Sequence, residues 1–359
     1  MFRPNDTLKQ IRQNKELWDI YTLKEEYSPC QLDRYGRFLH AYSTNQDVLV
    51  PRVSKYLVDN GYEIEYPDDK QFAVCLTHDV DEIYPPWEHA LLSILTCLKG
   101  LDFSGFKQQA FWKLRGKEKS PYWNFQEIMD MEEKYGARSS FYFLATDLDI
   151  RRFRYDIEDL EGELGRIVDR GWEVGLHGGY YACNDLEEIL REKERLERAL
   201  GRKVVGYRNH YLRFCMPDSW EVLEKAGFEY DTTLGYPDTV GFRNGMCHPF
   251  RPYNLRTDME VNILEIPMVI MDGTLFDSVR SYDEAWEVAK RLIETVAECH
   301  GVLTLNWHSN SFNCSFRTSW SRLYEKILSY CHERDAWMSC GKKSGGISIV
   351  KSVSHRRGQ

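Results

Sequence analysis

Acidic, basic and imidazole side chains follow short apolar runs at four places in the chain. They are Asp79 with Asp81, His177, Arg208 with His210, and His308. Carboxylates and imidazoles together form a ligand set for zinc or a similar divalent ion. Two carboxylates as close as Asp79 and Asp81 ionise together at low cost only beside a metal ion or an arginine. A lone DxD or a lone histidine is more often structural, but four such strand ends predict a metal site that also carries out acid–base chemistry.

The elements that position these residues alternate regularly from about residue 72. Apolar, strand-like runs occupy 72–77, 139–144, 172–176, 203–207, 228–230, 262–266 and 302–306. Helical patterns lie between most of these runs, which predicts βαβ units and a parallel sheet. Seven or eight such units are typical of an α/β barrel, in which the chemistry lies at the carboxyl ends of the strands.

Two segments fall outside this alternation. Residues 1–70 have mixed helical and extended patterns and predict an N-terminal accessory region, which leaves the barrel to residues 71–352. Residues 83–122 form a long insertion after the first strand, rich in aromatic residues and lysine. An insertion of this length is typical of a lid or binding loop. Residues 87–101 within it allow a peripheral contact with a membrane.

Composition narrows the class of protein. The 359 residues include 47 basic and 56 acidic ones, a net charge of -9, which argues against a nucleic-acid partner. The mean hydropathy is -0.55, and the apolar stretch from Ala90 to Leu98 is too short for a transmembrane segment. Ten cysteines are scattered without a CxxC pair, and no apolar signal core follows the first residues. We therefore expect a reduced, cytoplasmic protein.

The ordered motifs resemble the polysaccharide deacetylase family, the NodB-homology enzymes of carbohydrate esterase family 4, over about residues 72–350. The resemblance implies a distorted (β/α)7 barrel. The family's acidic pair implies that Asp79 is the general base and Asp81 a metal ligand. Its HxxxH motif makes His177 a second ligand, and its LxxH motif, Leu305 to His308 here, makes His308 the general acid.

Two further motifs imply positioning residues. The family's RxPY motif matches Arg208-Asn209-His210-Tyr211 in part, and the resemblance makes Arg208 the residue that orients Asp79 and keeps it ionised. The acid of the fourth motif corresponds to Asp231, which is expected to hold Arg208 in turn.

Two residues are expected to face the substrate. By the resemblance, the backbone N–H of Tyr211 faces the oxyanion that develops during hydrolysis. Trp307, the neighbour of His308, is a candidate to stack on a sugar ring.

The metal set departs from the family pattern. The second histidine of the HxxxH motif is replaced by Tyr181, so one of three protein ligands is missing. His210 stands where the family has proline, and we infer that it replaces the missing ligand. Tyr181 could instead hydrogen bond to a metal-bound water. His78 is a weaker substitute, because it should point to the opposite face of its strand from Asp79.

The function implied is metal-dependent hydrolysis that removes an N-acyl group, most simply acetyl, from an N-acetylated sugar during glycan or surface-polysaccharide biosynthesis. The cofactor implied is a divalent metal, zinc or else cobalt, nickel or iron. The partner is an N-acylated sugar or glycan intermediate. One alternative is an amidohydrolase acting on a non-sugar cyclic or linear amide. Another is a catalytically silent sugar-binding barrel, which the missing histidine favours and the complete proton-transfer set disfavours.

Overall fold

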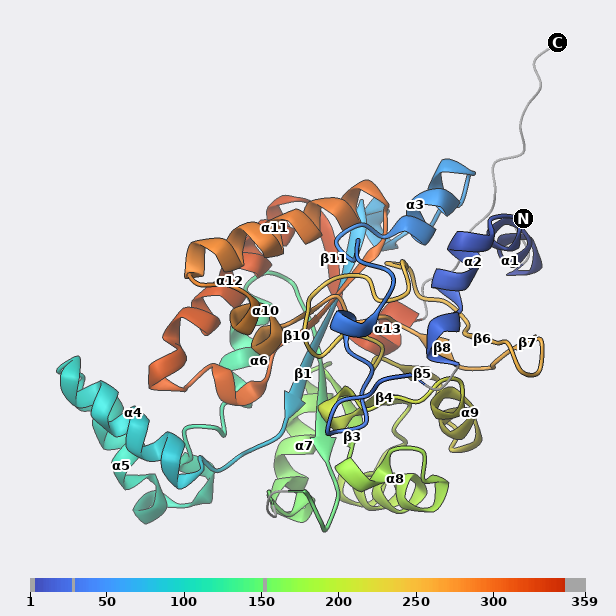
Figure 1. The fold of residues 1–359 in the computed structure, drawn as a ribbon. Helices are drawn as coiled ribbons and strands as arrows, with labels where there is room; N and C mark the ends of the chain where they lie inside the picture. Colours follow the sequence, from blue (N-terminus) through green and yellow to red (C-terminus); the bar gives the residue numbers. More distant parts are fainter. Residues whose placement is uncertain (1–3, 28–29, 151–153, 346–359) are drawn as a thin grey trace.

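The computed structural model describes residues 4–27, 30–150 and 154–345. Nine of its strands form one parallel sheet, in the order β8-β5-β4-β3-β2-β1-β10-β9 with β11 also paired to β1. Their bounds are β1 (Phe72–Val80), β2 (Ser140–Leu144), β3 (Glu173–Gly178), β4 (Gly206–Asn209), β5 (Tyr230–Asp231), β8 (Leu264–Glu265), β9 (Ile270–Met271), β10 (Val302–Asn306) and β11 (Ala336–Ser339). The sheet curls into a half-barrel wrapped by helices, which confirms the predicted distorted barrel (Figure 1).

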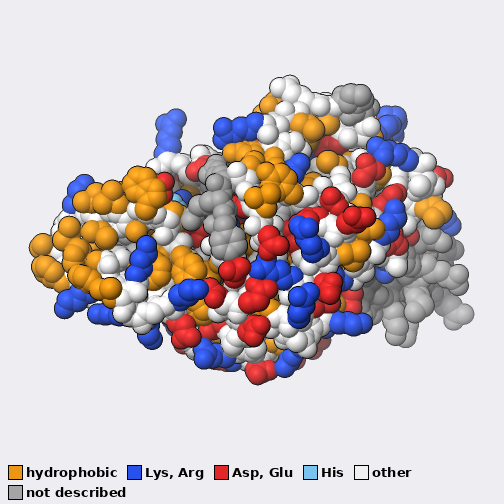
Figure 2. Space-filling model, turned by 90° about the horizontal axis from the view of Figure 1, so that it is seen from below, with side chains coloured by type: hydrophobic (Ala, Val, Ile, Leu, Met, Phe, Trp, Pro, Cys, Tyr) orange, Lys and Arg blue, Asp and Glu red, His pale blue; other side chains and the backbone are white. Residues whose placement is uncertain are grey.

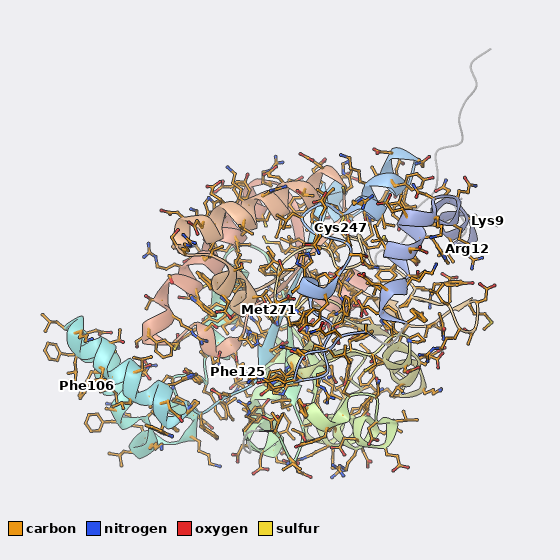
Figure 3. All side chains as sticks on the ribbon, viewed as in Figure 1. Lys9, Arg12, Phe106, Phe125, Cys247 and Met271 are labelled. Atoms are coloured by element: carbon orange, nitrogen blue, oxygen red, sulfur yellow. The ribbon has the colours of Figure 1, made fainter. Side chains whose placement is uncertain are left out.

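The helices that cover the sheet are α6 (Phe125–Glu133), α7 (Glu161–Asp169), α8 (Leu186–Leu200), α9 (Asp218–Lys225), α11 (Tyr282–Glu298) and α12 (Thr318–Glu333). Local signals set their ends. The Asp185 side chain accepts hydrogen bonds from the first N–H groups of α8, and Gly201 ends that helix in the left-handed conformation with φ of 70°. The core lies between these helices and the sheet, where Phe125 is fully buried (Figure 3).

Neighbouring side chains of β1 point to opposite faces of the sheet, one toward the surrounding helices and the other toward the inside of the barrel. His78 points outward from the barrel, where its Nδ1–H donates to the Trp307 carbonyl oxygen at 2.7 Å and its Nε2 meets Glu132 of α6 at 2.8 Å. Asp79 points to the inside. The prediction that His78 faces away from the acidic pair is therefore confirmed, because neighbouring residues of a strand lie on opposite faces.

The N-terminal segment packs beside the barrel through α1 (Pro4–Gln13), α2 (Lys15–Tyr21) and α3 (Arg52–Asp59). Its apolar side chains belong to the same hydrophobic cluster as those of the barrel. A buried ion pair joins Glu26 to Arg243, and the Gly245 carbonyl oxygen accepts the N–H groups of Val53 and Ser54. The boundary near residue 70 stays a prediction.

The insertion after β1 forms a helical hairpin, α4 (Trp87–Lys99) and α5 (Phe103–Arg115), that projects from the body of the molecule (Figure 1). Within the described residues, none of the helices combines the length and the apolar character that crossing a bilayer requires.

The remaining elements of the described residues are short helices and one β-hairpin. They are α2's neighbour η1 (Lys24–Glu26), η2 (His40–Tyr42), η3 (Pro67–Asp69), η4 (Lys117–Lys119), η5 (Ile157–Leu160), η6 (Tyr180–Ala182), η7 (His210–Leu212), η8 (Ser309–Ser311), η9 (Ser315–Arg317), α10 (Asp272–Ser278), α13 (Gly341–Gly345) and the hairpin of β6 (Tyr253–Asn254) with β7 (Met259–Glu260).

Candidate active site at the carboxyl ends of the strands

The predicted strand ends meet at one edge of the sheet. Asp79 lies near the end of β1 and Asp81 just after it, while His177 of β3 is in register with Arg208 of β4. His308 follows the end of β10. They border a cavity of about 280 Å³, whose lining is Arg37, Asp79, Asp81, Arg154, His177, His210, Tyr211, Leu212, Met271 and His308. This volume is near the lower end for small-molecule sites.

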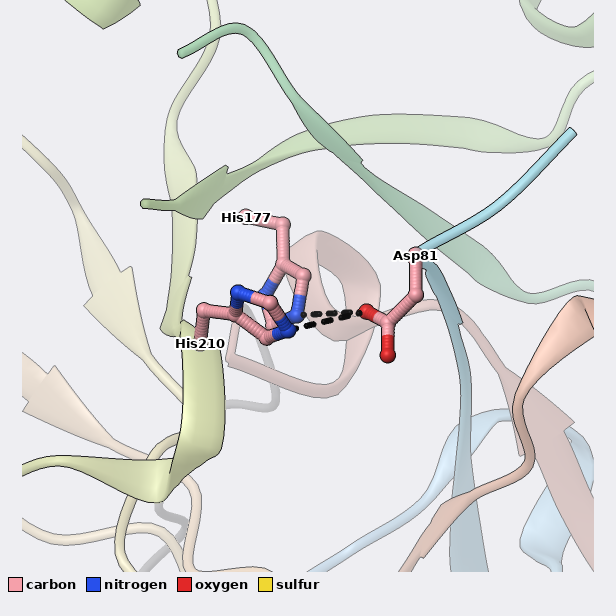
Figure 4. A group of neighbouring side chains, drawn as sticks. All are labelled: Asp81, His177 and His210. Carbon is pink, nitrogen blue, oxygen red and sulfur yellow. Dashed lines mark ion pairs between the residues drawn. The ribbon is translucent and has the colours of Figure 1, made fainter. Parts of the chain in front are cut away.

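Asp81, His177 and His210 converge on one point (Figure 4). One ligand atom from each lies within 4.8 Å of the other two. The Asp81 Oδ1 atom is 3.2 Å from Nε2 of His177 and 3.6 Å from Nε2 of His210. Metal–ligand bonds of about 2.1 Å in a tetrahedral zinc site place ligand atoms roughly 3.4 Å apart. The three side chains therefore fit a divalent ion.

The electrostatics of the same three residues favour positive charge at this point. Burial works against ionisation of Asp81, yet His210 and His177 hold its pKa well below the usual range. Burial likewise opposes a charged His177, yet Asp79 and Asp81 raise its pKa. Asp81 Oδ1 is buried and accepts no hydrogen bond of good geometry from the described residues. A buried oxygen in that state is what a cation would satisfy.

A neighbouring backbone group orients one of the two imidazoles, that of His177. The Nδ1–H of His177 donates to the Arg208 carbonyl oxygen at 3.1 Å, which turns Nε2 toward Asp81. A hydrogen bond of this kind fixes the ring orientation of metal-binding histidines. Nδ1 of His210 makes no hydrogen bond to the described residues and lies 3.7 Å from Oδ1 of Asp149, whose Oδ2 pairs with Arg154 at 2.6 Å.

Asp79 is held as an ionised carboxylate. Arg208 donates to its Oδ1 at 2.9 Å, and the Asn306 side chain donates to its Oδ2 at 2.8 Å. Burial favours the neutral acid, but Arg208 and then the imidazoles of His177 and His308 keep the pKa of Asp79 below its ordinary value. An ionised, fixed carboxylate in the cavity can accept a proton.

His308 is the second proton-transfer group, and Asp272 holds it. The Nδ1–H of His308 donates to Asp272 Oδ1 at 2.6 Å, and its backbone N–H donates to Oδ2 at 3.0 Å. Nε2 is left facing the cavity, 4.0 Å from Asp79 and 3.9 Å from Asp81. Burial lowers the pKa of His308, but Asp272 and then the acidic pair outweigh it and raise the pKa to about 10.

Two bacterial proteins with solved structures are similar to this chain in fold. A provisionally named polysaccharide deacetylase from Mycobacterium smegmatis is similar with a TM-score of 0.54 and 17% identity, over 83% of this chain and 98% of that one. A second such protein, from Pseudomonas aeruginosa PAO1, gives a TM-score of 0.52 and 15% identity, over 86% and 96%. This chain has the polysaccharide deacetylase fold. The expected NodB-like architecture is thereby confirmed.

A CE4 family pseudoenzyme from Bacillus anthracis is similar at a TM-score of 0.41 and 11% identity, over 78% of this chain and 66% of that one, which is too low to bear on activity. No protein-family model matches the sequence, and no curated protein does.

Within this deacetylase fold, Asp231 lies beside Glu265. Its Oδ1 accepts the N–H and hydroxyl of Thr233, and its carboxyl lies against Glu265. Burial raises the pKa of Asp231 to about 6, and burial together with the nearby Asp231 raises the pKa of Glu265 well above its ordinary value. Arg208 is held by the Thr77 hydroxyl at 2.8 Å and the Thr232 carbonyl oxygen at 3.2 Å. No hydrogen bond or ion pair joins the described side chains of Asp231 and Arg208, although the charge of Arg208 acts to lower the pKa of Asp231, so the expected role of Asp231 in holding Arg208 stays a prediction.

Trp307 is displaced from its expected role. Its ring is 0% exposed and packs against Phe276 and Tyr324. It cannot stack on a sugar, because it points into the core beside His78, away from the cavity. The residue after β10 continues the alternation of the strand, so Trp307 and His308 face opposite sides.

The two tyrosines considered for the site, Tyr211 and Tyr181, lie in different surroundings. Tyr211 lines the cavity in a left-handed conformation with φ of 63°, and its ring stacks on Tyr35 at 5.1 Å. Tyr181 is 49% exposed and lies outside the cavity lining. His210, rather than Tyr181, is the third member of the cluster.

Three residues that hydrogen bond to cavity-lining residues are not indicated by the sequence pattern: Asp272, Asn306 and Arg37. Asp272 follows β9, which has only two residues and gives no strand signal, although an acid after Val269-Ile270-Met271 fits the strand-end rule. Asn306 lies inside the motif around His308 and was passed over. Arg37 comes from the N-terminal segment, where it donates to the Tyr211 carbonyl oxygen at 3.1 Å, a contact no local pattern foretells.

Proposed function

We propose that this protein is a metal-dependent hydrolase that removes an N-acyl group from an N-acylated sugar. One observation carries the proposal: a cluster suited to a divalent ion shares a small cavity with an arginine-held carboxylate and a carboxylate-held histidine. A silent binding site has no need of that proton-transfer set. The fold of polysaccharide deacetylases is consistent with the reaction class.

Asp81, His177 and His210 would hold the metal, with zinc the first choice and cobalt, nickel or iron also suited to this ligand set. When bound, such an ion lowers the pKa of a water and polarises an amide carbonyl. The mixed carboxylate–imidazole set fits these ions better than calcium or magnesium, which prefer all-oxygen sites.

Asp79 would take a proton from the attacking water as the new C–O bond forms. Arg208 and Asn306 fix its two oxygens, so the carboxylate is in place before the reaction begins. His308 would give the proton on Nε2 to the nitrogen of the leaving amine as the C–N bond breaks, because an unprotonated amine is a poor leaving group. The backbone N–H of Tyr211 is proposed to face the oxyanion.

The size of the cavity bears on how much of the substrate it encloses. About 280 Å³ suits a single acylated sugar unit better than several bound units. We propose an intermediate of glycan or surface-polysaccharide biosynthesis. A reducing, cytoplasmic setting is supported by the ten cysteines, all of which are free thiols in the structure.

The first experiment measures the metal content of purified protein and of His210→Ala, with His332→Ala as the control because His332 lies exposed on α12. We expect about one zinc, cobalt, nickel or iron per chain in the parent and the control, and loss of at least tenfold in metal affinity for His210→Ala. Equal metal retention by His210→Ala would refute its role as a ligand.

The second experiment compares acetamido sugars with a cyclic ureide as substrates, using Asp79→Asn as the inactive control. Release of acetate from the sugar alone supports the proposal. Hydrolysis of the ureide alone would show instead that the protein is an amidohydrolase acting on non-sugar amides. Sugar binding with no hydrolysis at any metal loading would identify a silent binding protein.

A further inference from the structure

Residues 87–119 form a hairpin of α4, α5 and η4. Most of its apolar side chains face solvent rather than the body of the protein. The side chains of α4 that are buried against the body are Ser93 and Cys97. Cys97 meets the Ser315 hydroxyl, and Gln109 of α5 donates to the Asn313 carbonyl oxygen at 3.1 Å. A helix that stabilises a protein core normally buries its large apolar residues instead.

Most large apolar residues of the hairpin face outward; Trp112 of α5 is an exception, because it is buried and stacks on Tyr84. Trp87, Leu101 and Leu114 are 73%, 75% and 84% exposed. The exposed set is Trp87, Leu91, Leu92, Leu95, Leu98, Leu101, Phe103, Phe111 and Leu114. In Figure 2 side chains of this kind gather over the projecting end of the molecule, bordered by lysine and arginine. A contiguous exposed apolar surface of this kind marks an interaction site.

The charge around this surface is positive. Six basic residues and three acidic ones lie within 87–119, and the basic ones are all exposed: Lys99, Lys107, Lys113, Arg115, Lys117 and Lys119. The rest of the chain has 41 basic and 53 acidic residues and so carries a net charge of -12. The hairpin is therefore a basic, apolar projection on an acidic protein.

We propose that the hairpin docks the protein on an anionic lipid surface. Each helix has 13 residues and is about 20 Å long, which suits a helix lying in the interface. The exposed leucines and Phe103 would enter the boundary between headgroups and acyl chains. The basic side chains would pair with lipid phosphates, and Trp87 would sit at headgroup level.

The positive charge of the hairpin favours a bilayer over a second copy of the chain as the partner that covers its apolar surface. Two hairpins packed face to face would bring their exposed lysines together, at a cost in repulsion. An anionic bilayer supplies the opposite charge and an apolar layer at once. The inference concerns only this surface and does not depend on the reaction proposed for the cavity.

The test is sedimentation of the full-length protein with vesicles of phosphatidylcholine, alone or mixed with phosphatidylglycerol. The variant carries Leu91→Ser, Leu95→Ser and Leu98→Ser. Its matched control carries Leu148→Ser, Leu190→Ser and Met259→Ser, which replace apolar residues exposed outside the hairpin. Circular dichroism and thermal unfolding confirm that both fold as the parent does.

We expect the parent and the control to bind the mixed vesicles and the hairpin variant to bind at least about tenfold more weakly. Binding of the parent should weaken on phosphatidylcholine alone and in high salt. The inference is overturned if the parent binds neither vesicle, or if the hairpin variant binds as the parent does. It is also overturned if light scattering shows a dimer that the hairpin variant dissociates while vesicle binding is absent.

Discussion

Asp272→Asn is expected to slow hydrolysis of an amide without removing the metal. Asp272 is fully buried and accepts four hydrogen bonds: from His308 Nδ1 and N, from the Ser311 hydroxyl and from the Gly273 N–H. Asparagine keeps the shape but replaces the negative charge that favours protonated His308. A hydrogen bond to a charged group contributes about 1.5–3 kcal/mol. That corresponds to a fall of roughly 10- to 150-fold in kcat.

Comparison of leaving groups isolates the role of His308. The amide substrate needs a proton on its departing nitrogen, whereas a p-nitrophenyl ester leaves without one. We therefore expect Asp272→Asn to lose kcat on an acetamido sugar and to lose much less on p-nitrophenyl acetate, with metal content equal to that of the parent. Equal losses on both substrates, or no loss on the amide, would refute the assignment of Asp272 as the residue that positions the general acid.

Three further outcomes are expected. Arg243→Met leaves Glu26 buried without a cation and should lower the free energy of unfolding by about 3–5 kcal/mol in urea, whereas Glu26→Leu with Arg243→Met should restore most of it. Tyr181→Ala, at an exposed position, should leave metal content unchanged by elemental analysis. Burial lowers the pKa of His248 to about 4. Just below pH 6.5 this side chain therefore binds more protons in the unfolded chain than in the folded one. Between pH 7 and 5 the free energy of unfolding of the parent should fall by about 2 kcal/mol more than that of His248→Asn.

The strand ends could be predicted from the sequence because each is a local signal. An apolar run followed by Asp79, His177 or His308 needs no knowledge of the partner strands, since a parallel sheet brings its carboxyl ends to one edge. The opposite directions of His78 and Asp79 follow from the same two-residue period. The position of His210 beside His177 was predictable for the same reason, as it follows a strand next to that of His177.

The partners of these residues were not predictable in the same way. Asp272 and His308 are 36 residues apart, and Arg37 meets Tyr211 across 174 residues. Asp231 lies beside Glu265 because β5 pairs with β8, which places the two residues in register. The strand β8 has only two residues and could not be recognised from the sequence. Strands this short show no periodic pattern in the sequence. The residues that pair with them are therefore known only from the assembled sheet.

The sequence by itself determined the class of fold and the edge of the sheet at which the candidate residues gather, whereas the structure grouped His210, and not Tyr181, with Asp81 and His177. Only the tertiary structure decided which side chains are buried, as in Trp307, and which apolar residues are left uncovered, as in the hairpin. Periodicity shows that one face of an element is apolar, but burial depends on what other elements cover that face. Those elements lie far away in the chain, so their positions are a property of the folded molecule.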